Sequence, residues 1–272
     1  MPGILVAVVS AKGSPGVTTL GLGLAARWPH PEAVLVEADP AGGDLSARFG
    51  LPHEPGLAAM ALAARHRDTQ QDPVEWLQQL PCGVGVVLAP PGAAARASVS
   101  ALASRGVPLL KQLAGERAVV VDAGRWEPES PAGPLLAAAD VVLLLARPSL
   151  EEIGQAQARA RALRQLAGDV RLVLAAGRGR WPAGEVAAAV GLAPAGVLAG
   201  RLVPRRGWGR SGWSSWTRLP LLRACHSLGR WLDSSVHAPP PPVAVSAEAT
   251  SHGPTPTAPA APRVDRQEVK SS

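Results

Sequence analysis

A glycine-rich stretch near the start of the chain, "SAKGSPGVTTLG" (residues 10–21), has the residue types of a phosphate-binding loop. Gly16 and Thr18 stand where the pattern G-x-x-x-x-G-K-[ST] requires a glycine and a hydroxyl, but Val17 occupies the lysine position. Glycines let the backbone approach an anion, and the free N–H groups at a helix start attract it. Without the lysine, the stretch is either a phosphate site or a plain turn that opens a helix.

Three acidic residues further along the chain are candidates for the metal part of such a site. Glu37 and Asp39 follow the apolar run "AVLV", and Asp122 follows "AVVV". Carboxylates, together with the hydroxyl of Thr18, suit a magnesium ion bound to phosphate. The alternatives are that Thr18 and Thr19 cap a helix, that Asp39 begins a turn and that Asp122 caps a strand end. The occurrence of all these groups in this order favours a magnesium–nucleotide site.

Apolar runs alternate with helical patterns along the chain, and this alternation predicts the scaffold that positions these groups. The runs are nearly continuous, as strands buried on both faces of a sheet require. We therefore predict an α/β fold with a doubly wound, mostly parallel sheet, in which ligands bind beyond the carboxyl ends of the strands. Strands are expected at residues 4–9, 33–38, 83–89, 118–123, 141–146 and 170–176, and helices at 18–28, 57–66, 94–105 and 150–168.

The order of these motifs resembles the MinD/ParA family of deviant-Walker P-loop ATPases. The loop of that family reads K-G-G-x-G-K-[ST]-T, and this chain reads K-G-S-P-G-V-T-T over residues 12–19. The resemblance continues through "EADP" (37–40), Asp122 and "ADVVLLLARPSLEEI", and it extends over about residues 3–232. It implies a P-loop fold, ATP and Mg²⁺ as cofactors, and a homodimer that encloses the nucleotide.

The resemblance also implies a role for each matching residue. Lys12 corresponds to the lysine that reaches the partner's nucleotide, and Asp39 to the carboxylate that orients the attacking water, so both are catalytic candidates. Thr18, Asp39 and Asp122 are the candidates for the magnesium site, and Glu37 takes the place of a further aspartate. The nucleotide would be held by Lys12, Gly13, Ser14, Pro15, Gly16, Val17, Thr18 and Thr19.

Four departures from the family pattern weaken the implied activity. Val17 removes a charge-assisted phosphate contact worth roughly 1.5–3 kcal/mol, which is about one to two decades in affinity. Ala11 and Ser14 replace loop glycines. Residues 175–177 lack the asparagine that reads adenine in many relatives, and residues 205–206 are basic where an acidic residue is common. The lysine matters most in the transition state, so we expect slow hydrolysis, with nucleotide binding better retained.

A basic stretch rich in tryptophan lies in the last part of the predicted domain. Residues 186–232 contain seven arginines and no Asp or Glu. This stretch is either a surface for DNA, an anionic membrane or an acidic partner, or an irregular loop in which arginine stacks on tryptophan. The residues of the candidate surface are Arg201, Arg205, Arg206, Arg210, Trp208, Trp213 and Trp216.

The segment 219–232, "LPLLRACHSLGRWL", has the spacing of an amphipathic helix. We predict that it is the final helix and closes the sheet, in preference to docking on a membrane. Its apolar face comprises Leu221, Leu222, Cys225, Leu228 and Leu232.

Composition and domain limits complete the prediction. The two cysteines lie far apart, which argues against a disulfide framework and for a cytoplasmic protein, at most peripheral to the nucleoid or inner membrane. We expect one MinD/ParA-like domain over residues 1–233, followed by a disordered, proline-rich tail over 234–272.

The leading functional hypothesis is a degenerate ATP-binding protein that dimerises and positions or partitions a cargo, such as a chromosome, a plasmid or envelope machinery. The alternative is a nucleotide-independent pseudo-ATPase scaffold, or localisation factor, for pilus or secretion assembly. A metabolic enzyme of the wider P-loop superfamily is disfavoured, because the sequence has no second group of residues suited to a small substrate.

Overall fold

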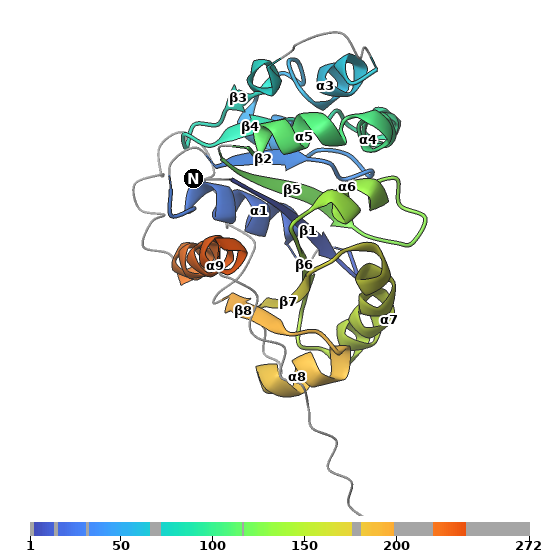
Figure 1. Ribbon diagram of the computed structural model, residues 1–272, viewed down its shortest axis with the longest axis vertical. Coiled ribbons are helices and arrows are strands. Elements are labelled where there is room, and N and C mark those ends of the chain that lie inside the picture. The colour runs from blue at the N-terminus through green and yellow to red at the C-terminus, as the bar shows by residue number, and fades with distance from the viewer. Residues whose placement is uncertain are drawn as a thin grey trace, which may run out of the picture. The chain divides into compact units, whose positions relative to one another are not determined.

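The computed structural model describes residues 3–13, 16–30, 33–65, 72–115, 117–175, 181–198 and 220–237. In these ranges the chain forms an eight-stranded sheet of order β3–β4–β2–β5–β1–β6–β7–β8, with helices on both faces (Figure 1). All neighbouring strands are parallel except β3 and β4, which are antiparallel. The predicted doubly wound, mostly parallel α/β fold is therefore confirmed.

Six of the eight strands in the described ranges overlap the six predicted apolar runs, whereas β3 and β8 were not predicted. The strands are β1 (Ile4–Ser10), β2 (Val34–Glu37), β3 (Gln78–Gln79), β4 (Gly85–Val87), β5 (Ala118–Arg125), β6 (Val141–Ala146), β7 (Val170–Ala175) and β8 (Pro194–Leu198). The helices are α1 (Val17–Ala26), α2 (Leu45–Phe49), α3 (Leu57–Ala63), the 3-10 helix η1 (Pro73–Trp76), α4 (Ala93–Arg105), α5 (Val107–Leu113), α6 (Gly133–Ala138), α7 (Leu150–Leu166), α8 (Ala183–Val190) and α9 (Pro220–His237).

The central strand β1 is buried on both faces, because side chains of a strand alternate between the two sides of a sheet. Leu5, Ala7 and Val9 belong to the apolar cluster shared with helices α3 to α8. Residues 4, 6 and 8 belong to the second cluster, which α1 and α9 complete on the opposite face. Figure 1 shows α1 and α9 together on one side of the sheet and α4 to α7 on the other.

Helix α1 is packed closely on two sides, and a glycine makes each approach possible. A Cβ on Gly21 would lie 3.0 Å from the Leu35 Cδ1 atom of the sheet, and a Cβ on Gly23 would lie 2.7 Å from the Cys225 Sγ atom of α9. Residues two apart in a helix project about 200° from each other, so the two glycines face opposite sides. The "GLG" sequence thus lets α1 pack closely between the sheet and α9.

Helix α9 closes this face of the sheet, as predicted. Its apolar side is buried in the cluster that α1 completes, and the His226 Nδ1 atom lies 3.0 Å from the Arg27 carbonyl oxygen at the end of α1. The helix extends to His237, past the predicted start of the tail at Ser234. Residues 238–272 lie outside the described ranges, so the disordered tail stays a prediction. Among the described helices, none combines the length and apolar character that a membrane span requires.

Candidate functional site

The loop after β1 leads directly into α1 at the carboxyl edge of the sheet. Gly16 is the N-cap of α1, with a φ of 105° and a ψ of 37°, a left-handed conformation that favours glycine. No side chain within the described residues caps α1, so Thr18 and Thr19 do not have the capping role considered for them. The N–H groups of the first turn therefore remain suited to an anion. Ser14 and Pro15 lie outside the described residues.

Val17 belongs to the core instead of to the surface of the loop. Its side chain is only 6% exposed and is part of the same apolar cluster as Val8 and Leu20. The substitution therefore removes the lysine charge and also places an apolar group in the contact between α1 and the sheet. Lys12 and Gly13, by contrast, are exposed.

Asp122 lies in β5, where its backbone is in register with Val8 of β1 on one side and Glu37 of β2 on the other. The residue is 2% exposed. Its Oδ1 atom accepts a hydrogen bond from the Gly124 N–H at 3.0 Å, and the Thr18 side chain is hydrogen bonded to the same carboxylate. The structure thus brings together the hydroxyl and one carboxylate that the sequence singled out.

The environment of Asp122 strongly disfavours its charged form. Burial, together with the charges of Asp39 and Glu37, raises the pKa of Asp122 to about 7. The hydrogen bonds from Thr18 and from the Gly124 N–H act in the opposite direction. The charged form of Asp122 is therefore disfavoured by burial and by two neighbouring acids. A cation bound at such a site would relieve the repulsion between the carboxylates.

Asp39 is half-buried at the start of a tight turn. Its Oδ1 atom accepts a hydrogen bond from the Ala41 N–H at 2.8 Å, and its carbonyl oxygen accepts one from the Gly42 N–H at 3.1 Å. Asp39 therefore does begin a turn, and this local role is compatible with a role in the site. Its carboxylate lies against Gly124, where φ is 62° and a Cβ would overlap the carboxylate carbon.

Nearby charges modify the ionisation of Asp39. Burial raises the pKa of the Asp39 carboxyl, and the charge of Asp44 adds to this effect. The Ala41 N–H and the Arg125 guanidinium act in the opposite direction. The same side chain is therefore linked electrostatically to both Asp122 and Arg125.

Glu37 does not have the position expected of a third acidic group facing a metal ion. Its Oε1 atom accepts hydrogen bonds from the N–H groups of Asp44 at 2.9 Å and Leu45 at 3.0 Å, and Oε2 accepts one from Ala89 at 3.1 Å. A Cβ on Gly43 would lie 2.6 Å from Oε2, so the loop closes tightly around the carboxylate. Burial raises the pKa of Glu37, whereas the three N–H groups lower it. The extra methylene of Glu37 serves this backbone clamp.

Lys12 lies near the first turn of α7. The pKa of Glu151 is lowered by hydrogen bonds of its own backbone N–H and of Ser149, and, to a smaller extent, by the charge of Lys12. Lys12 is exposed, and among the described residues no hydrogen bond or ion pair joins it to Asp39 or Asp122.

Thr18, Asp39 and Asp122 remain as possible oxygen ligands. They suit Mg²⁺ when phosphate oxygens complete its coordination. Mg²⁺ usually keeps several waters and binds one or two carboxylates together with substrate phosphates. Within the described ranges no three acidic, histidine or cysteine side chains form a metal cluster. Thr18 and Asp122 supply a hydroxyl and a carboxylate in direct contact, and Asp39 lies within electrostatic reach. These residues suit a magnesium–nucleotide complex better than a free metal ion.

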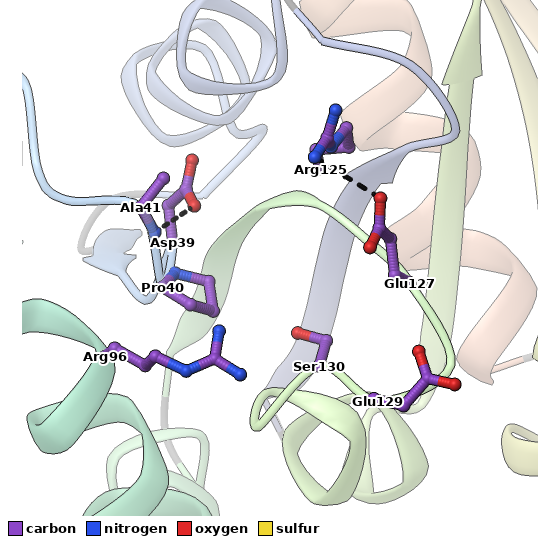
Figure 2. A pocket seen from close by; sticks show the side chains of 8 residues that line it. All are labelled: Asp39, Pro40, Ala41, Arg96, Arg125, Glu127, Glu129 and Ser130. Atoms are coloured by element: carbon purple, nitrogen blue, oxygen red, sulfur yellow. Dashed lines mark hydrogen bonds and ion pairs between the residues drawn. The ribbon is translucent and has the colours of Figure 1, made fainter. Parts of the chain in front are cut away.

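A pocket of about 240 Å³ is lined in part by Asp39 (Figure 2). Sequence reasoning singled out only Asp39 among its residues, although the charge-dense segment "RWEPES" directly after the Asp122 strand was a usable signal. The pocket is lined by Asp39, Pro40, Ala41, Arg96, Arg125, Glu127, Glu129 and Ser130.

Several predicted residues lie outside the described ranges, and their predictions stay open. These are Ala176 and Gly177 of the expected base-recognition segment, and Arg201, Arg205, Arg206, Arg210, Trp208, Trp213 and Trp216 of the basic surface.

A parallel sheet with a glycine-containing loop between its central strand and α1 is an arrangement that P-loop α/β proteins also have. Solved structures that are similar to this fold include ATPases of the MinD/ParA family. A ParA family ATPase from Chlorobium tepidum TLS is 16% identical, with a TM-score of 0.63 over 84% of this chain and 98% of its own. MinD from Pyrococcus horikoshii OT3, complexed with Mg-ADP, is 15% identical, with a TM-score of 0.65 over 85% and 96%.

A McdA variant from Cyanothece in complex with ATP is 16% identical, with a TM-score of 0.60 over 85% of this chain and 97% of its own. The sequence matches no protein-family model and no curated protein. At these identities the similarity establishes the fold. The resemblance to MinD and ParA expected from the motifs is therefore confirmed at the level of the fold.

Proposed function

We propose that this protein binds Mg-ATP weakly through its degenerate loop, dimerises through the nucleotide, and positions or partitions a cargo. The proposal is carried by the contact of Thr18 with the buried Asp122, beside the open N-terminus of α1. Structures with the same fold in complexes with Mg-ADP and ATP support the choice of ligand. The cargo adaptor would be a protein partner, and the basic stretch around Arg205 and Arg206 is a candidate contact with DNA or an anionic membrane.

Each residue contributes a distinct interaction in this proposal. The first-turn N–H groups of α1 and the loop glycines hold the phosphates, and Thr18 and Asp122 hold Mg²⁺. The bound Mg²⁺ neutralises phosphate charge. Asp39 accepts a hydrogen bond from the attacking water, and Lys12 reaches the nucleotide of the second subunit. Val17 supplies no charge to the transition state, so hydrolysis is slow even where binding persists.

A nucleotide-independent scaffold is the second candidate, and the burial of Val17 favours it. A side chain that completes the contact between α1 and the sheet is expected where the loop is maintained for packing. In that case the fold serves as a docking platform, and the protein partner alone determines the function.

Calorimetric titration with a non-hydrolysable ATP analogue and Mg²⁺ separates these candidates. We expect saturable binding that is lost in Thr18→Ala and retained in Thr18→Ser, which keeps the hydroxyl. Sedimentation with the same analogue should show dimers in the unchanged protein but not in Lys12→Ala. An absence of binding up to millimolar analogue would refute the proposal and leave the scaffold.

Restoring the missing lysine provides a gain-of-function test of the same proposal. Val17→Lys should raise affinity for the analogue by about one to two decades if the phosphates lie against the loop. The matched control is Val17→Ile, which changes the packing without adding charge. An equal effect of the two substitutions would argue against phosphate binding at this position.

A further inference from the structure

The pocket beside Asp39 is lined by an exposed guanidinium that has no partner among the residues that the structure describes. Arg96 lies in the first turns of α4 and lines the pocket. It makes no ion pair or hydrogen bond with any other described residue. Figure 2 shows its guanidinium pointing across the pocket toward the Ser130 hydroxyl. That hydroxyl accepts a 3.3 Å hydrogen bond from the Ala132 N–H, and its own proton remains available to a ligand.

The three acidic side chains of the pocket either have hydrogen-bond or ion-pair partners or point away from Arg96. The Glu127 Oε1 atom lies 3.3 Å from an Arg125 nitrogen and 3.7 Å from an Arg159 nitrogen, so one carboxylate is shared by two guanidinium groups. Asp39 accepts the Ala41 N–H. Figure 2 shows the Glu129 carboxylate directed away from Arg96.

The charges around the pocket nearly cancel, so placement of individual groups decides what it binds. Together with Arg159, the lining carries three arginines and three carboxylates. Arg96 and Ser130 nevertheless face each other across the pocket, and Arg125, the ion-pair partner of Glu127, lies at a third position on its lining. A guanidinium presents N–H groups in a planar fork that matches a carboxylate.

We propose that this pocket binds a small dicarboxylic acid. One carboxylate lies between Arg96 and Ser130, and the second is held by Arg125, whose partner Glu127 is also paired with Arg159. A volume of about 240 Å³ lies below the roughly 300–1,000 Å³ of pockets for drug-sized ligands, so the site suits a small acid and not a second nucleotide.

The pocket shares Asp39 with the candidate nucleotide site, so the two sites should be coupled. This consequence rests on the proposed function, whereas acid binding does not. The dicarboxylate and the nucleotide are both anionic, and both would bind next to Asp39. Each should therefore lower the affinity for the other by about two- to fivefold. The factor must be the same in both directions, because coupling free energies are reciprocal.

The primary experiment monitors the Arg Nε–Hε resonances by NMR in the full chain without nucleotide. The probes are linear dicarboxylates from malonate to adipate, acetate as a single carboxylate, and putrescine as a dication. We expect a saturable shift of the Arg96 resonance with at least one dicarboxylate, at lower concentration than with acetate. Arg96→Ala should weaken binding about tenfold or more, and Arg96→Lys less. Arg105→Ala, at the far end of the same helix, is the matched control.

A second variant tests the two-point geometry. Arg125→Ala should weaken the dicarboxylate severalfold and leave acetate unchanged. The proposal is overturned if no dicarboxylate gives a saturable shift up to tens of millimolar, if Arg105→Ala weakens binding as much as Arg96→Ala, or if putrescine binds in place of the acids. Dicarboxylate binding without any change in nucleotide affinity would retain the pocket and refute the coupling alone. A failure of nucleotide binding would leave the acid titration unaffected.

Discussion

Replacing Asp122 by asparagine should stabilise the nucleotide-free protein, although it removes a central residue of the candidate site. The substitution preserves shape and keeps an oxygen acceptor for the Gly124 N–H. Its new amide can donate to the Thr18 hydroxyl, which contacts Asp122 in the native site. What the substitution removes is a carboxyl that must ionise while buried beside Asp39 and Glu37.

The magnitude follows from the raised pKa. Asp122 has an ordinary pKa of 3.8, which burial and, to a smaller extent, the charges of Asp39 and Glu37 raise to about 7 in the folded state. Each tenfold change in proton affinity is worth about 1.4 kcal/mol, so full ionisation costs the folded protein up to roughly 4 kcal/mol. The folded state binds this proton more tightly than the unfolded state. The proton's contribution to stability is therefore fully present below the unfolded pKa of 3.8 and lost as pH rises through about 7.

Urea unfolding of the two proteins at about pH 5 and about pH 8, in the presence of EDTA, measures this contribution. We expect Asp122→Asn to be the more stable protein at both, with an advantage about 1–2.5 kcal/mol larger at the higher pH. The conservative range allows for the coupling of Asp122 to its two acidic neighbours. A pH-independent difference, or a less stable asparagine variant at the higher pH, would show that Asp122 does not bear this burial cost.

Two further predictions concern the clamp and the helix contact. Glu37→Ala should lower the free energy of unfolding by about 3–5 kcal/mol, because three backbone N–H groups lose their acceptor, and Glu37→Gln should lower it less. If urea unfolding shows that Glu37→Ala lowers this free energy by less than about 1 kcal/mol, the clamp is contradicted. Gly23→Ala should cost about 1–3 kcal/mol through overlap with the Cys225 sulfur. Adding Cys225→Ala should recover part of that loss in a double-mutant cycle, and strictly additive effects would contradict direct contact.

Much of the fold could be predicted from local patterns. The run at residues 141–146 coincides with β6, because a strand buried on both faces must be apolar throughout and is readable without its neighbours. Helix α9 could also be predicted from the sequence, because its apolar residues recur at helical spacing, and they are buried as expected. Parallel strands place their carboxyl ends at one edge, and this rule was sufficient to bring Thr18 and Asp122 together.

Other features depend on partners that are remote in sequence. Glu37 was interpreted as a metal-facing acid, but both of its carboxylate oxygens accept hydrogen bonds from backbone N–H groups, including that of Ala89, 52 residues away. The sequence shows only that Val17 replaces a charged lysine, whereas the structure shows that its side chain is buried in the core. The sequence by itself determined six of the described strands, five of the described helices and the identity of the chemical groups, because these depend on local composition and period. Only the tertiary structure decided which carboxylate stays available and where Arg96 faces a pocket, because hydrogen bonding and burial are settled by neighbours that the chain brings together on folding.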